Sequence, residues 1–239
     1  MAKLFRFAVS GSIIVALGVR LGGGASYGMI STDLGGGSCL MDDFNTRVGP
    51  IVRGIASGLI PMAIFTPVYA IWPVFAWPLP GAIFFAAALG WSVFLAVRAA
   101  KLIKFAGGVP NETNAYDARI SKGMTIVSSI QGALIVTSVV VLALLSQHVW
   151  ILPVVVLIVG LHFFPMPAIF GRTIDYYLGG FMLIVAGTGL YLASQSGIDW
   201  QVTSGITGFG AALVTSAFGL YIVRAGNTAL TTYRQLQSA

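Results

Sequence analysis

The sequence predicts an all-α polytopic membrane bundle of six transmembrane helices arranged as three hairpins. The 239 residues are 57% hydrophobic and only 8% charged, with a mean hydropathy of +0.91, whereas a soluble domain carries about 25% charged residues. Two long stretches, 54–97 and 123–171, contain no Asp, Glu, Lys or Arg. The Lys and Arg residues are confined to a few segments outside these two stretches, which is typical of a chain folded in lipid.

The first charge-free stretch covers 44 positions, from 54 to 97. One helix of about 20 residues spans the hydrocarbon, so this stretch predicts two helices, near 52–72 and 81–99. Between them stand prolines, which break helices, and tryptophans, which favour the membrane interface. These residues are Trp72, Pro73, Trp77, Pro78 and Pro80.

The second charge-free stretch covers 49 positions and is interrupted in polarity only at 146–148. It predicts helices near 124–146 and 149–165, because each part is long enough to span a bilayer. Pro165 and Pro167 end the second of these helices.

The last hairpin consists of helices near 173–193 and 203–223. A polar turn, 194–200, separates them, and a polar tail follows the second.

Ten of the 13 Lys and Arg residues fall at the start of this core, in the loops between hairpins or at its end. The three hairpin tips contain one charged residue, Asp199. The positive-inside rule therefore predicts that both ends of the core are cytoplasmic. The ten cations are Arg47, Arg53, Arg98, Lys101, Lys104, Arg119, Lys122, Arg172, Arg224 and Arg234.

Residues 1–40 do not fit this pattern. Their apolar segment, 7–19, is too short to span comfortably and is typical of a signal-peptide core or an interfacial helix. A spanning segment there would also reverse the charge rule for the ten cations. We therefore expect a non-spanning or signal-like extension at 1–40, with Met41 a candidate start, and a six-helix domain at 41–239.

The densest polar cluster surrounds the turn between the fourth and fifth helices and contains His162, Arg172, Asp175 and Tyr176. One interpretation is structural: Arg172 pairs with Asp175, Thr173 caps the helix, and Asp175 favours its positive end. The alternative is a binding site in which His162 relays a proton and Arg172 holds an anionic group.

Gln131 lies well inside the third helix. An amide in hydrocarbon needs a partner, so we expect Gln131 to face the bundle interior, as packing contact or as substrate contact.

Small residues recur at helical spacing on four of the expected helices. Such rows let helix backbones approach closely, and we expect packing inside the bundle rather than an oligomer face. The rows are Gly54 and Gly58; Ala82, Ala86 and Gly90; Ser128 and Gly132; and Ala211, Thr215 and Gly219.

No catalytic or cofactor motif is present in the sequence, so we expect no enzyme activity, no cofactor and no metal. A single cysteine, Cys39, excludes an internal disulfide and a CxxC motif. The net charge of +6 is dispersed over short loops and does not indicate nucleic-acid binding. The expected partners are the lipid bilayer and a membrane protein or a second copy of the chain.

The segment GLHFFPMPAIFGRTIDYYLGG at 160–180 resembles uncharacterised bacterial multi-helix inner-membrane families with a His-Phe-x-Pro turn between two late helices. The resemblance implies a bacterial inner-membrane protein and no particular reaction. Two functions are compatible with the sequence. One is a small permease or channel for a neutral or lipophilic solute, with the Pro-bent first helix, the Gly-rich sixth helix and Gln131 lining the path. The other is a non-catalytic binding or assembly subunit.

Overall fold

The computed structural model describes residues 37–108, 115–170 and 173–237, and every regular element in these ranges is a helix. Six of the described segments are long and apolar enough to cross a membrane, which confirms the predicted fold class. In chain order the elements are α2 (Gly37–Ala70), α3 (Trp72–Ala76), α4 (Pro78–Gly107), α5 (Ala115–Leu144), α6 (His148–His162), α7 (Met166–Phe170), α8 (Ile174–Ser194) and α9 (Trp200–Gln237).

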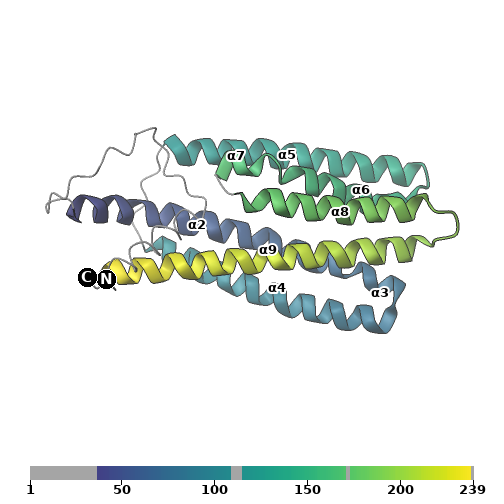
Figure 1. Ribbon diagram of the computed structural model, residues 1–239, viewed down its shortest axis with the longest axis horizontal. Helices are drawn as coiled ribbons and strands as arrows, with labels where there is room; N and C mark the ends of the chain where they lie inside the picture. The colour runs from purple at the N-terminus through teal and green to yellow at the C-terminus, as the bar shows by residue number, and fades with distance from the viewer. Residues whose placement is uncertain (1–36, 109–114, 171–172, 238–239) are drawn as a thin grey trace, which may run out of the picture.

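Helix α9 joins the two halves of the bundle. It packs against α2, α3 and α4 on one side and against α6 and α8 on the other. Helices α2 and α4 pack together, as do α6 and α8. Helix α5 lies along one edge of the bundle, with α6 and α7 as its main neighbours, and α4 lies along the opposite edge (Figure 1).

The three hairpin turns lie at one end of the bundle, which we call the tip end (Figure 1). They are the α3 region, residues 145–147 and residues 195–199. The opposite end, where α2 begins and α4 and α9 end, carries the described Lys and Arg residues and is called the basic end. The first turn is itself partly helical, because α3 and α4 are separated only at Trp77, with φ −138° and ψ 87°.

Four helices extend beyond their expected bounds: α4 runs to Gly107 and α5 begins at Ala115, in addition to α2 and α9. Helix α2 begins at Gly37, so the expected division at residue 40 falls inside it, and residues 1–36 lie outside the described residues. Helix α9 continues through the predicted polar tail to Gln237. The tail stays helical because it packs: the ring of Tyr233 lies edge-on to that of Phe105 on α4, with 5.3 Å between centroids.

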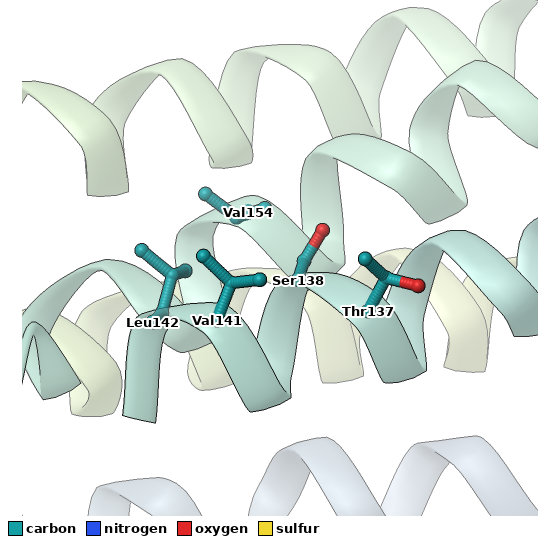
Figure 2. Close-up of a pocket in the computed structure, with 5 residues that line it drawn as sticks. All are labelled: Thr137, Ser138, Val141, Leu142 and Val154. Atoms are coloured by element: carbon teal, nitrogen blue, oxygen red, sulfur yellow. The ribbon is translucent and has the colours of Figure 1, made fainter. Parts of the chain in front are cut away.

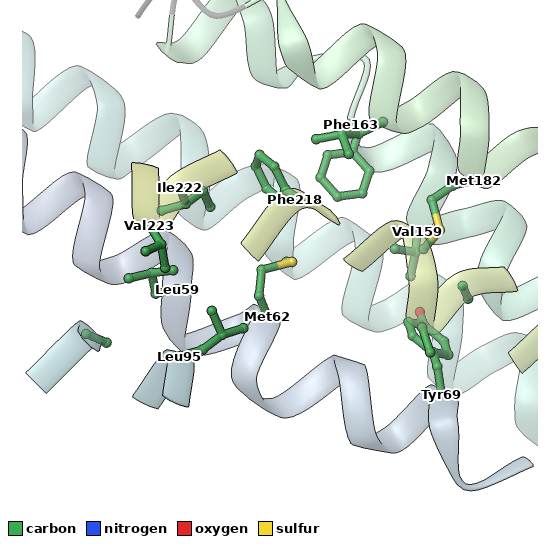
Figure 3. Packing of buried hydrophobic residues seen from close by; sticks show 14 of the residues in the cluster. Leu59, Met62, Tyr69, Leu95, Val159, Phe163, Met182, Phe218, Ile222 and Val223 are labelled. Atoms are coloured by element: carbon green, nitrogen blue, oxygen red, sulfur yellow. The ribbon is translucent and has the colours of Figure 1, made fainter. Parts of the chain in front are cut away.

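The buried core follows α9 through the bundle (Figure 3). Leu59 of α2 lies close to Ile222 and Val223 of α9 (Figure 3). On the other side, Phe163 lies edge-on to Phe218, with 5.8 Å between ring centroids, and so joins the end of α6 to α9. These contacts bury apolar side chains from both halves around one helix.

The rows of small residues divide into buried and exposed sets. The α9 row of Ala211, Thr215 and Gly219 is buried, as expected for packing inside the bundle. The α4 row is different, because Ala82, Ala86 and Gly90 are all exposed. The remaining small residues also divide: Gly58 is half-buried, whereas Gly54, Ser128 and Gly132 are exposed.

Candidate functional site

Helix α5 is the least buried of the six spans. No residue between Ile120 and Leu144 is buried, whereas the other five spans bury 22% to 50% of their most apolar stretch. One stripe of α5 is half-buried and faces the bundle, and we call it the α5 seam. Its members include Val127, Gln131, Ile135, Ser138 and Leu142.

Gln131 lies in the middle of the α5 seam and is half-buried on the side of α5 that faces the bundle. The neighbouring helix α6 has the sequence HVWILPVVVLIVGLH, so its interior provides apolar side chains only. Within the described residues, no hydrogen bond joins the Gln131 amide to another group. A polar amide therefore lies at mid-span without a hydrogen-bond partner among the residues that the structure describes.

His162 ends α6 and faces the α5 seam. Its half-buried ring faces the backbone of Val127, one turn of α5 away from Gln131. The ring also lies edge-on to Phe163, at 6.0 Å and 81°. The buried Nδ1 atom has no hydrogen-bond partner among the described residues. The fold thus places two of the predicted site residues, His162 and Gln131, along one seam.

Asp175 and Tyr176 lie elsewhere, at the start of α8. Asp175 is fully buried in the first helical turn, where the helix dipole favours a negative charge. Tyr176 is half exposed, and its ring lies 6.1 Å from that of Phe164. Thr173 occupies the N-cap position but makes no capping hydrogen bond with its side chain, so this part of the structural interpretation is wrong. Arg172 lies outside the described residues, and its pairing with Asp175 stays a prediction.

An open groove of about 330 Å³ follows the α5 seam toward the tip end. Figure 2 shows Thr137, Ser138, Val141 and Leu142 in a row along α5, with Val154 of α6 facing them. The sequence places Ser138 seven residues after Gln131, which puts both on one helix face. The groove itself was not predicted, since it depends on how closely α6 approaches this face.

Thr215, a buried polar residue of α9, is not part of the seam. It accepts a hydrogen bond from Thr66 of α2 at 3.1 Å, and its own hydroxyl donates to the carbonyl of Ala211 at 3.0 Å. Both threonines are buried, at 0% and 3% exposure. The hydroxyls of Thr66 and Thr215 are therefore used in packing between α2 and α9.

The described residues contain no group of three or more His, Cys, Asp or Glu side chains that would hold a metal ion. The candidate site is thus the α5 seam, with one amide, one imidazole and two hydroxyls beside an apolar groove. Comparison of the chain with protein-family models, curated proteins and solved structures gives no match, so the resemblance of residues 160–180 stays a prediction.

Proposed function

We propose that this membrane protein is a non-catalytic subunit that binds or assembles with another membrane component through α5. The observation that carries the proposal is the low burial of α5, which has no buried residue between Ile120 and Leu144. A span that contacts its own chain along one stripe leaves the rest of its surface for lipid or for a partner.

The chemistry of the exposed flank of α5 favours a partner over lipid alone. Small and hydroxyl-bearing residues follow one another there at helical spacing, and a Cβ added at Gly132 would meet no atom within 4 Å. Small side chains let a second helix approach closely, and amides and hydroxyls supply hydrogen bonds between helices in hydrocarbon. The flank consists of Ser121, Thr125, Ser128 and Gly132, with Gln131 at its edge.

In the bacterial inner membrane that we propose as its location, both ends of the six-helix core lie in the cytoplasm. The positive-inside rule supports this orientation, because the tip end contains Asp199 and no Lys or Arg. A Cys39→Ser background allows the test, since the chain has one cysteine. In intact cells, a membrane-impermeant maleimide should label Ser196→Cys at the tip end and should not label Thr228→Cys on α9. The reverse labelling pattern would overturn the orientation.

Crosslinking tests the role of α5. In the Cys39→Ser background, Ser128→Cys on the α5 flank is compared with Val93→Cys on the exposed face of α4, where the native valine is 63% exposed. After treatment of native membranes with a short bis-maleimide, we expect a discrete crosslinked product for Ser128→Cys and none for Val93→Cys. Equal crosslinking at both positions, or none at either, would contradict the proposal.

The second candidate is a small permease for a neutral or lipophilic solute, favoured by the groove at Thr137 and Ser138. Reconstituted vesicles with glycerol as the probe separate the two functions. A non-catalytic subunit adds no glycerol permeability over empty vesicles. Permeability that Ser138→Leu removes by filling the groove would favour the permease instead.

A further inference from the structure

The basic end carries cations from two neighbouring helices at one depth in the membrane. A helix rises about 1.5 Å per residue, so about 20 residues cross the hydrocarbon of about 30 Å. Helix α4 begins at the tip end with Pro78 and α9 begins there with Trp200. Arg98 and Arg224 lie 20 and 24 residues further on, which places both at the boundary between hydrocarbon and headgroups.

Side-chain contacts bring these parts of α4 and α9 together. A Cβ added at Gly219 would lie 2.8 Å from the side chain of Leu95, and one added at Gly226 would lie 3.1 Å from that of Leu102. The segment of α4 between these contacts carries Arg98 and Lys101, and the matching segment of α9 carries Arg224. The three cations therefore lie at one level on adjacent helices, and Lys104 follows one turn beyond Lys101.

The chain supplies no carboxylate to these cations from the two helices that carry them, because neither α4 nor α9 contains an Asp or Glu. The guanidinium of Arg98 lies over the ring of Phe94, 5.4 Å from its centroid, which keeps this charge close to the hydrocarbon. Lys101, Lys104 and Arg224 are exposed. Charges at this depth favour an anionic partner in the headgroup layer.

The residues one turn deeper suit acyl chains. Val97 precedes Lys101 by four residues and Leu220 precedes Arg224 by four, so each apolar side chain shares a helix face with a cation. Val97 is 47% exposed and Leu220 is 39% exposed. Each helix face thus carries a cation at the level of the headgroups and an apolar side chain one turn deeper. This arrangement is complementary to a phospholipid with an anionic headgroup.

We propose that Arg98, Lys101, Lys104 and Arg224 form a basic surface that binds the phosphate headgroups of anionic phospholipids, whose acyl chains lie along α4 and α9. Arginine offers planar, paired donors to phosphate oxygens, and lysine adds a mobile charge. The site does not depend on α5 and is independent of the proposed function.

The experiment uses the full chain, purified in a neutral detergent, with phosphatidylglycerol or phosphatidylcholine added at matched concentrations. Bound lipid is counted by native mass spectrometry, and thermal unfolding is measured in parallel. We expect phosphatidylglycerol to bind in preference to phosphatidylcholine and to raise the unfolding temperature. Equal binding of the two lipids would overturn the proposal.

Charge-removing variants locate the site. Because each headgroup-level cation contributes about a 5-fold gain in affinity, Lys101→Gln with Arg224→Gln should weaken phosphatidylglycerol binding by about 25-fold. Arg234→Gln is the control for the arginine substitution: it removes one positive charge ten residues further along α9, beyond the headgroup layer, and should change binding little, whereas Arg224→Gln alone should weaken it about 5-fold. Lys101→Arg should retain binding. Equal weakening by the control variant would show a general charge effect and contradict the site.

A competition experiment distinguishes a site for a lipid from a site for a free anion. Inorganic phosphate is added as competitor at a concentration far above that of the lipid. A lipid site that uses Val97 and Leu220 as well as the cations should keep its phosphatidylglycerol. Complete displacement by phosphate would instead show a site for the free anion and overturn the lipid assignment.

Discussion

Thr66 of α2 donates a hydrogen bond to Thr215 of α9 at 3.1 Å across the buried centre of the bundle. The Thr215 hydroxyl in turn donates to the carbonyl oxygens of its own helix, at 3.0 Å from Ala211 and 3.1 Å from Ala212. The two threonines are therefore unequal, because Thr215 has partners within α9 and Thr66 relies on Thr215. This difference in hydrogen bonding predicts that removing the two hydroxyls has unequal effects on stability.

We expect Thr215→Val to destabilise the protein more than Thr66→Val does. Valine keeps the shape of threonine, so each substitution removes a hydroxyl and little else. Thr215→Val leaves the buried Thr66 hydroxyl without its acceptor, at a cost of about 1 kcal/mol, in the range measured for hydrogen bonds between membrane helices. Thr66→Val leaves Thr215 bonded to its own helix. Unfolding in mixed micelles measures both values, and a larger cost for Thr66→Val would contradict the prediction.

Gly208 is a position where α9 approaches the backbone of α2. A Cβ added there would lie 2.6 Å from the carbonyl oxygen of Tyr69 and 2.8 Å from the Cβ of Trp72. Gly208→Ala should therefore destabilise the protein by about 1–3 kcal/mol, because a backbone atom or a bulky side chain must move.

The matched control is Gly90→Ala on the exposed face of α4, where nothing lies within 4 Å of the added Cβ. Alanine is the better helix former by up to about 1 kcal/mol, so this variant should be neutral or more stable. Thermal unfolding of both variants in one detergent is the measurement. A loss of stability at Gly90→Ala equal to that at Gly208→Ala would show that close approach is not the cause.

The six spans could be predicted from the sequence because a charge-free stretch has few alternatives in a bilayer. The sequence could not predict which face of each helix is buried, because lipid and protein interior are equally apolar. The small residues of α4 and α9 illustrate this: Gly90 is exposed and Gly219 is buried, although their sequence patterns are alike. The length of α9 was predicted too short because contacts beyond its expected end, such as that of Tyr233 with Phe105, extend the helix.

The candidate site was predicted in part. Gln131 stands out in the sequence as an amide inside an apolar span, and it does face the bundle side of α5. Its position near His162 depends on how α5 packs against α6. Both helices are apolar on all sides, so their sequences do not indicate which faces meet. The level of Arg98 and Arg224 could have been predicted by counting residues from Pro78 and Trp200, but their adjacency required the fold.

The end of α9 depends on an aromatic contact beyond the expected end of its span. Tyr233→Ala removes the edge-on pair with Phe105, worth about 0.5–1.5 kcal/mol beyond its buried area, and should free the last turns of α9. Hydrogen exchange should become faster by about tenfold for amides in 226–237 and stay unchanged at the tip end. Tyr191→Ala, at a residue that is 65% exposed, is the control and should leave exchange in 226–237 unaltered. Protection that persists in Tyr233→Ala would contradict the role of this pair.

Gln131→Leu should make the single chain more stable but weaken its association with a partner. In the purified single chain the Gln131 amide has no hydrogen-bond partner among the described residues, so leucine should stabilise the fold by about 1 kcal/mol. In native membranes the same substitution removes a donor and an acceptor from α5, and it should weaken the crosslink formed by Ser128→Cys. Val136→Leu, at an exposed apolar position of α5, should change neither quantity. A less stable single chain would show that Gln131 is satisfied within its own bundle, and an unchanged crosslink would remove it from the interface.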